Sequence, residues 1–165
     1  MLSLARLPKR QHSVNASAGD VLTSLIVPVI KLEAHFSRAG EAIAAAGGQT
    51  LARWLALEMV ADTPATVAQI ARRLELTRQS VQRVADLLQK DGLTEYVDNP
   101  AHQRSKLVQI TPSGQETLRT IQAAQRAWAN RVGAEIGEAD LRHASDVVDR
   151  LTRVLAPPRS GSSRT

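Results

Sequence analysis

TVAQIARRLELTRQSVQRVADLLQKDGL, residues 66–93, is the stretch of sequence that predicts the fold most directly. Thr66 and Gln69 have the spacing of a capping box, in which the threonine hydroxyl accepts from the third helical amide and the glutamine reaches back. Apolar residues then recur at helical spacing, and the break at residues 75–77 is long enough only for a tight turn. Thr77 has the side chain of an N-cap for the residues that follow. The stretch therefore predicts a helix, a tight turn and a second helix.

The second helix has a polar side opposite its buried stripe. At 100° per residue this side carries Gln79, Gln82, Arg83, Asp86 and Lys90, with Arg78 and Ser80 beside its first turn. Glutamine and arginine make paired hydrogen bonds to base edges in the major groove, and hydroxyls at a helix N-terminus suit phosphates. The alternative is an ordinary solvated helix face, which commonly carries the same side chains.

Two short strands, residues 93–98 and 106–110, are predicted after Gly92. They are joined by NPAHQRSK, residues 99–106, which is longer than a tight hairpin turn, contains no glycine and carries Arg104 and Lys106. The order is then helix, turn, helix, strand, cationic loop and strand. We therefore predict a winged helix-turn-helix with residues 99–106 as its wing.

Long helices are predicted on both sides of this block. Apolar residues alternate in steps of three and four at Leu22, Leu25, Val29, Leu32, Phe36, Ala39 and Ile43. Pro28 lies inside this helix, and it should either kink the helix or mark the start of its firmly formed part. A helix over residues 50–61 follows. Thr111 and Pro112 predict the start of another through about Val132, and a last helix is expected after Gly137.

These helices predict a domain organisation. We expect tails at residues 1–19 and 157–165, an N-terminal dimerisation helix at 20–47, a winged helix-turn-helix domain at 48–111 and C-terminal dimerisation helices at 112–156. Packing within one chain is the commoner explanation for any single amphipathic helix. Here three long apolar seams surround a short middle block that can bury only part of them, which favours a helical homodimer.

Composition agrees with a mostly α fold that carries a small β-hairpin. The chain has 165 residues, of which 43% are hydrophobic and only 2% aromatic, and it has no cysteine. The net charge is +5 and the pI about 10.4, which suggests a polyanionic partner, although no segment is a basic block. Nothing resembles a secretory signal or a membrane span, so we expect a cytoplasmic protein.

The sequence resembles the MarR-type bacterial transcription regulators over roughly residues 49–155. The resemblance rests on the two helices of residues 66–93, on the wing NPAHQRSKLVQITPSG, residues 99–114, and on the long flanking helices. It implies a homodimer that places two winged domains on a near-palindromic double-stranded DNA site, probing the minor groove with Arg104 of the wing. By position, the residues that match the contacts of the recognition helix, residues 77–90, are Thr77, Arg78, Gln79, Ser80, Gln82 and Arg83. Lys106 lies at the base of the same cationic wing.

One position departs from the family pattern. An aspartate usually lies two residues before the wing arginine and helps to hold it, but this chain has His102 there. Either the wing is more mobile, or Asp98 or another carboxylate takes over. The resemblance also implies a small aromatic or anionic effector in a cleft beside the dimer helices, for which the candidate residues are His35, Phe36, Arg38 and Trp54. Phe36 and Trp54 would more commonly be core residues.

An enzyme is the main alternative class, and the sequence offers it little. The four histidines are scattered, no pair has metal-ligand spacing, and the common nucleotide and hydrolase motifs are absent. We expect no catalytic residues, no metal and no cofactor. A second alternative is a winged helix that contacts proteins or packages DNA without sequence preference, because a fold does not fix a function.

Overall fold

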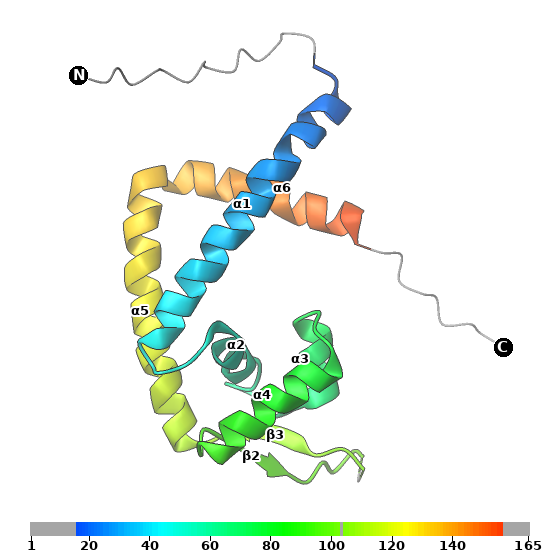
Figure 1. Cartoon of the computed structure of the whole chain (residues 1–165), viewed down its shortest axis with the longest axis vertical. Helices are drawn as coiled ribbons and strands as arrows, with labels where there is room; N and C mark the ends of the chain where they lie inside the picture. The colour runs from blue at the N-terminus through cyan, green and yellow to red at the C-terminus, as the bar shows by residue number, and fades with distance from the viewer. Residues whose placement is uncertain (1–15, 103, 157–165) are drawn as a thin grey trace, which may run out of the picture. The chain divides into compact units, whose positions relative to one another are not determined.

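The computed structural model describes residues 16–102 and 104–156 and is mostly helical, with a small antiparallel sheet (Figure 1). This confirms the predicted fold class. The chain forms two compact units, residues 1–42 and 43–165, whose boundary lies within the first helix. The helices are α1 (Ala18–Ala45), α2 (Leu51–Met59), α3 (Val67–Arg73), α4 (Arg78–Lys90), α5 (Pro112–Ile136) and α6 (Glu138–Leu155).

Threonine caps set the starts of four helices. Thr50, Thr66, Thr77 and Thr111 each precede a helix, and each side chain accepts a hydrogen bond from the backbone N–H three residues later. At Thr66 the capping box is complete, because the Gln69 side chain accepts from the Thr66 N–H over 2.8 Å. Pro112 occupies the first turn of α5, where its missing N–H costs nothing. The helix starts predicted at Thr66, Thr77 and Thr111 are therefore confirmed.

The sheet has three strands in the order β1-β3-β2. The predicted hairpin is present as β2 (Thr94–Val97) and β3 (Leu107–Ile110), with Tyr96 opposite Val108. β1 (Ala65–Thr66) pairs with the other edge of β3 and was not predicted. It is two residues long and runs directly into the α3 cap, so it is too short to show an alternating pattern.

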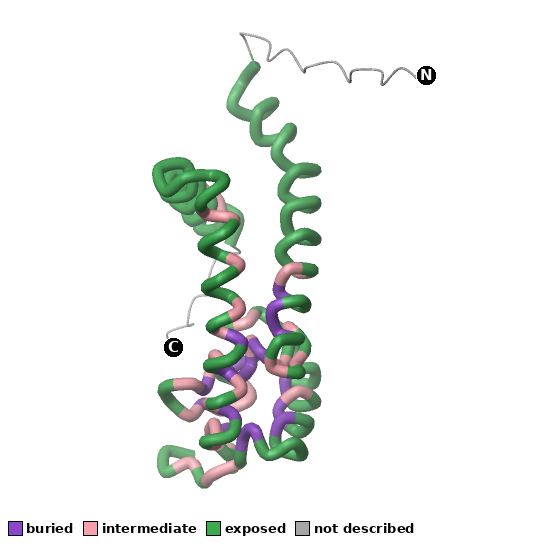
Figure 2. The backbone as a smooth tube through the Cα atoms, turned by 90° about the vertical axis from the view of Figure 1, so that its left-hand side faces the viewer, coloured by how far each residue is buried: buried purple, intermediate pink, exposed green. Residues whose placement is uncertain are grey.

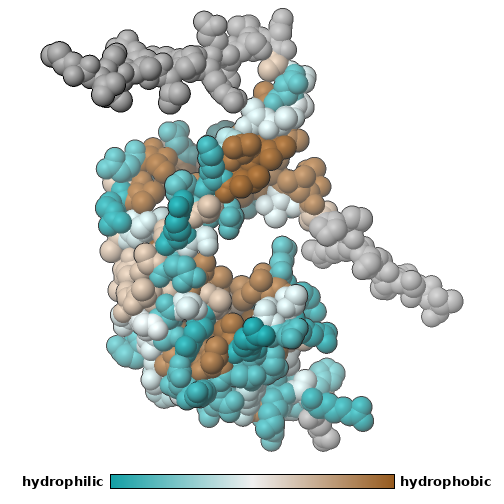
Figure 3. Space-filling view, in the orientation of Figure 1, coloured by the Kyte–Doolittle hydropathy of each residue, from teal (hydrophilic) through white to brown (hydrophobic). Residues whose placement is uncertain are grey.

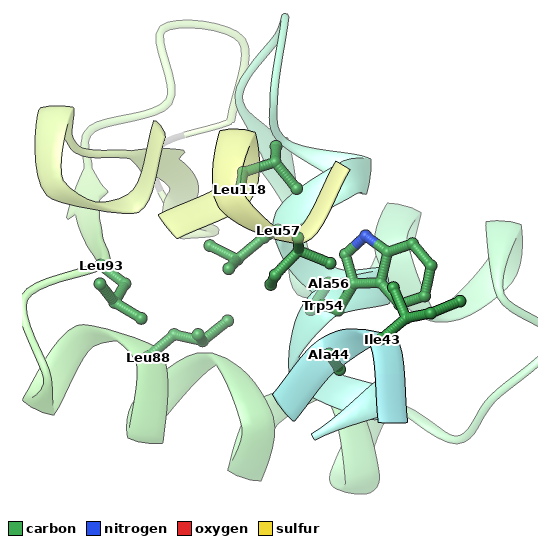
Figure 4. Close-up of a cluster of buried hydrophobic side chains, with 9 residues drawn as sticks. Ile43, Ala44, Trp54, Ala56, Leu57, Leu88, Leu93 and Leu118 are labelled. Carbon is green, nitrogen blue, oxygen red and sulfur yellow. The ribbon is translucent and has the colours of Figure 1, made fainter. Parts of the chain in front are cut away.

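The core lies where α2, α4 and the first half of α5 meet (Figure 4). Leu57 of α2 is fully buried and lies between Leu88 of α4 and Leu118 of α5. A second cluster, formed by Val60, Ala65, Ile70, Ala71, Val81, Ala85 and Val108, joins α3 and α4 to the sheet. The buried stripes predicted for the two short helices thus fix α3 and α4 against each other and against the hairpin.

α5 differs from its prediction in two ways. It continues through Gly133 to Ile136, past the predicted end near Val132, because the left-handed φ of 93° falls at Gly137 and not at Gly133. Its apolar seam is also core over the first half, since Leu118 and Ile121 are buried within the same chain. That half of α5 follows the commoner intrachain interpretation of an amphipathic helix.

α1 and α6 are exposed along much of their length (Figure 2), and their exposed residues include many large apolar ones. α1 is continuous through Pro28, so the hypothesis that its firmly formed part begins there is wrong. Leu22, Val29 and Leu32 of its predicted seam are exposed, and hydrophobic surface is visible along the helix (Figure 3). α6 is described in full and has no buried residue. None of the helices within residues 16–102 and 104–156 is long and apolar enough to cross a membrane.

Candidate nucleic-acid interface

The N-terminus of α4 is held by its own first residues. Thr77 Oγ1 accepts from the Ser80 N–H over 3.1 Å and donates to Ser80 Oγ over 3.0 Å, while Ser80 Oγ donates to the Thr77 carbonyl over 2.8 Å. Both hydroxyls therefore serve the cap, although both residues are exposed. The first turn of α4 consequently has a fixed geometry, and its exposed amide end can face an anion.

A groove of about 960 Å³ lies between α3, the N-terminal half of α4 and the wing. Four cationic side chains line it: Arg72 of α3, Arg78 of α4, and Arg104 and Lys106 of the wing. Within the described part of the chain no carboxylate lines this groove. The surface around the hairpin is correspondingly hydrophilic (Figure 3). A solvent-exposed groove with only positive charges attracts a polyanion.

The wing turn is organised by an amide and a hydroxyl. Asn99 Oδ1 accepts from the Ala101 N–H over 3.0 Å, as in an Asx turn, and Asn99 Nδ2 donates to Ser105 Oγ over 3.2 Å. Among residues 16–102 and 104–156, Arg104 has no hydrogen-bond or ion-pair partner, and neither Asp98 nor another carboxylate pairs with it. Asn99 and Ser105 thus shape the turn that carries Arg104.

A hydrogen-bonded group joins α4 to β2. Gln82 Nε2 donates to Asp86 Oδ1 over 2.8 Å and to the Tyr96 hydroxyl over 2.7 Å, and that hydroxyl donates to Asp86 Oδ1 over 2.8 Å. Burial raises the pKa of Tyr96 to about 12, and the hydrogen bond to Asp86 acts in the same direction. The Tyr96 phenol is therefore protonated at neutral pH and remains a donor to Asp86.

The predicted DNA-contacting residues fall into three groups. Arg78, Gln79, Gln82, Arg104 and Lys106 line the groove. Thr77 and Ser80 form the cap, and Arg83 is exposed on α4 outside the groove lining.

Sequence reasoning missed three residues of this interface: Arg72, Tyr96 and Asn99. Arg72 could have been found as a basic residue in the last turn of the first short helix. The partners of Tyr96 and the bond of Asn99 to Ser105 depend on how the wing folds, so the sequence carries no local signal for them. The Asx turn from Asn99 to Ala101 is local and could have been predicted from Asn99 and Pro100.

Three contacts hold the C-terminal end of α4 to α2 and to the start of α5, and a fourth joins α5 to the segment after α2. Thr111 Oγ1 donates to the Gly92 carbonyl over 2.7 Å, and the Thr111 N–H donates to the Leu93 carbonyl over 3.1 Å. Arg53 of α2 forms an ion pair of 2.5 Å with Asp91, the C-cap of α4, and the Gln115 side chain donates to the Ala61 carbonyl. The end of α4 is thereby fixed to α2 and to the start of α5.

The residues predicted to bind an effector do not form one described site. In α1, His35 Nδ1 lies 3.0 Å from Arg38 Nη2, and Phe36 is exposed. Trp54 belongs to the second unit, where it is 7% exposed and donates from Nε1 to Glu58 Oε1 over 3.0 Å. Trp54 is thus a core residue with a satisfied indole N–H. In the described part of the chain no group of three or more histidine, aspartate or glutamate side chains could hold a metal ion.

Known proteins are similar to this chain in sequence and in fold. The sequence profile of the MarR family matches residues 48–105 of this chain. An uncharacterized protein of Mycobacterium tuberculosis is 38% identical over 140 residues, which cover 85% of this chain and 98% of that protein.

Two solved structures have a similar fold. The crystal structure of the MarR family transcription regulator SP03579 has a TM-score of 0.75 and 26% identity, covering 82% of this chain and 91% of that one. Staphylococcus aureus MarR in complex with salicylate and kanamycin has a TM-score of 0.73 and 17% identity, covering 82% of this chain and 92% of its own.

Proposed function

Because this chain belongs to the MarR family of winged helix transcription regulators, which are not enzymes, we propose that it binds double-stranded DNA as a homodimer and represses transcription from a near-palindromic site. The recognition helix, residues 77–90, would lie in the major groove and the wing, residues 99–106, in the minor groove. The expected location is the cytoplasm, on the nucleoid when DNA is bound.

The observation that carries this proposal is the cationic groove between α4 and the wing. Arg78 and Lys106 line it and can neutralise phosphates, whereas Gln79 and Gln82 present amides that suit base edges. Thr77 and Ser80 support the same contact by presenting the N-terminus of α4 to a phosphate. Arg83 lies beside them on the exposed side of the helix.

The homodimer is supported by the apolar side chains of α1 and α6. Leu22, Val29, Leu32, Leu141 and Val148 are each at least 40% exposed in the single chain. Monomeric soluble proteins rarely expose contiguous apolar stretches of this length, so a second copy of the chain is the proposed cover. The proposed domains follow: dimerisation helices at 20–47 and 112–156, and a DNA-binding domain at 48–111.

Footprinting on DNA retrieved by in vitro selection tests the proposal. A specific homodimer should enrich one near-palindromic motif and protect two half-sites whose centres lie about 10 bp apart. A packaging protein would instead coat any duplex without a favoured register, and a protein-interaction module would enrich no DNA. Either of those results would refute the proposed function.

We further propose that a small aromatic or anionic effector releases the DNA by binding near His35, Phe36 and Arg38 of α1. The solved S. aureus MarR binds salicylate, which is both aromatic and anionic. An effector of this kind must favour the arrangement that does not bind DNA. Salicylate should therefore weaken DNA binding by the wild-type chain, and Arg38→Ala should reduce its effect. If salicylate released DNA equally from the wild type and from the Arg38→Ala variant, the effector would bind elsewhere.

A further inference from the structure

Gln82, Asp86 and Tyr96 form a closed set of hydrogen bonds at the edge of the groove. Gln82 Nε2 lies 2.8 Å from Asp86 Oδ1 and 2.7 Å from the Tyr96 hydroxyl, which itself lies 2.8 Å from the same carboxylate oxygen. A primary amide has two N–H donors. Both donors of Gln82 are therefore used within the protein.

The chemistry of the three side chains fixes the orientation of the amide. If the Gln82 amide were turned over, its carbonyl oxygen would face Asp86 Oδ1, and two acceptors would meet without a hydrogen between them. The single hydroxyl hydrogen of Tyr96 could not satisfy both oxygens. Only the orientation with Nε2 toward Asp86 and Tyr96 pairs every group, so the Gln82 carbonyl oxygen must point away from the network.

What remains accessible on Gln82 and Asp86 can only accept hydrogen bonds. Gln82 Oε1 has both lone pairs available, and Asp86 offers the oxygen that the network does not use. The two residues are four positions apart on one exposed side of the helix, and both are exposed. Tyr96 stays protonated at neutral pH, so its hydroxyl keeps its donor bond to Asp86 under physiological conditions.

We infer that Tyr96 and Asp86 restrict Gln82 to accepting hydrogen bonds, so that Gln82 selects any base with an exocyclic amino group in the major groove. An unrestricted glutamine recognises adenine through two hydrogen bonds: its amide N–H donates to N7, and its carbonyl oxygen accepts from the N6 amino group. Without its donors, Gln82 accepts equally from N6 of adenine or N4 of cytosine and disfavours guanine and thymine, whose O6 and O4 are acceptors. The inference rests on the proposed DNA-binding function and adds a specificity-determining pair, Tyr96 and Asp86, to it.

In vitro selection with the full chain and randomised duplex DNA tests this inference. Gln82→Ala first identifies the base pair that depends on Gln82, because its preference is lost there. The wild type should enrich adenine and cytosine at that position to within about threefold of each other. Tyr96→Phe keeps the ring and releases one N–H of Gln82, so it should raise the ratio of adenine to cytosine by about fivefold or more, the lower bound for a bidentate pair.

Two further variants complete the design. Asp86→Ala releases the other N–H and should shift the ratio in the same direction, which keeps the test valid if Tyr96→Phe folds poorly. Glu95 lies next to Tyr96 on β2, is exposed and does not enter the network. The control variant Glu95→Gln should therefore keep the wild-type base preference.

The outcomes distinguish a failure of the inference about Gln82 from a failure of the proposed DNA-binding function. An unchanged ratio in both folded variants would overturn the inference, as would a wild type that enriches adenine alone. A complete loss of preference in Tyr96→Phe would also overturn it, since the phenol would then merely position the amide. If the wild type enriches no motif at all, the DNA-binding function itself fails.

Discussion

Arg104 is an exposed cation on the wing with no ion-pair partner among the described residues. Its charge is therefore available to the narrow minor groove, where the negative potential of DNA is strongest. We expect Arg104→Ala to weaken binding to all sequences by about tenfold and to lower the slope of log affinity against log salt by about 1. Fluorescence anisotropy at several salt concentrations measures both quantities. Arg126→Ala, which removes an exposed arginine of α5 outside the groove, is the matched control.

Tyr96 gives the fold a dependence on alkaline pH. Its folded pKa is raised to about 12, mainly by burial, against an ordinary value near 10. The protonated phenol therefore contributes stability that is fully present below about pH 10 and is lost as the pH rises from about 10 to about 12. Urea unfolding across this range should show a steeper loss for the wild type than for Tyr96→Phe.

The titration itself gives a direct check of this pH dependence. Tyr96 is the only tyrosine of the chain, so ultraviolet absorbance of tyrosinate reports its ionisation alone. Half-ionisation near pH 10 in the folded chain would contradict the assigned burial and the bond to Asp86.

At the scale of elements, the joint between α5 and the segment after α4 depends on a close approach of two backbones. A Cβ at Gly114 would lie 2.1 Å from the Leu93 carbonyl oxygen and 2.8 Å from Ile110 Cγ1. The carbonyl belongs to the backbone and cannot move aside cheaply, so Gly114→Ala should lower the free energy of unfolding by about 1–3 kcal/mol. Chemical denaturation measures this change.

Gly133→Ala is the matched control, because it lies in the same helix with its nearest side-chain neighbour, Leu141 Cδ1, 3.8 Å from the added Cβ. It should stabilise the chain by about 0.5–1 kcal/mol through a better helix propensity. Equal effects of the two substitutions would show that the contact with Leu93 is not tight.

The wing is an element whose conformation depends on Asn99. Removing its side chain in Asn99→Ala deletes the bonds to the Ala101 N–H and to Ser105 Oγ, so the turn that carries Arg104 loses its support. We expect weaker DNA binding with little change in the free energy of unfolding, because the turn is on the surface. Asp98→Ala should leave binding unchanged, since Asp98 forms no described ion pair with Arg104. If Asp98→Ala weakened DNA binding and Asn99→Ala did not, Asp98 would be the residue that holds Arg104.

These elements differ in how far the sequence determines them. Caps are local, so Thr66, Thr77 and Thr111 predicted their helices correctly. β1 forms only by pairing with β3 and was missed, and the continuation of α5 past Gly133 was missed because the left-handed glycine that ends the helix is Gly137. Several groove residues were predicted from helical spacing, but the network of Gln82 with Tyr96 joins positions 14 residues apart and has no signature in spacing.

At the scale of the whole molecule, the proposed homodimer places the apolar seams of α1 and α6 in an interface. Val29 lies in the α1 seam and is 52% exposed in the single chain. Because a two-fold interface contains every substitution twice, Val29→Glu would bring two unpaired carboxylates into an apolar contact. We expect a loss of about 3 kcal/mol or more in association free energy, which sedimentation equilibrium would detect as a shift from dimer to monomer.

Ala34→Glu is the control for this prediction. Ala34 is exposed and lies nine residues after Leu25 of the apolar seam, which places it on the side of α1 opposite to that seam. The substitution therefore adds the same charge outside the proposed interface. That variant should remain dimeric. The monomeric Val29→Glu chain should keep the unfolding behaviour of its winged domain, whose core lies in residues 43–121, yet lose the two-half-site footprint. If Val29→Glu stays dimeric and protects both half-sites, α1 takes no part in assembly, and its exposed seam requires a different partner.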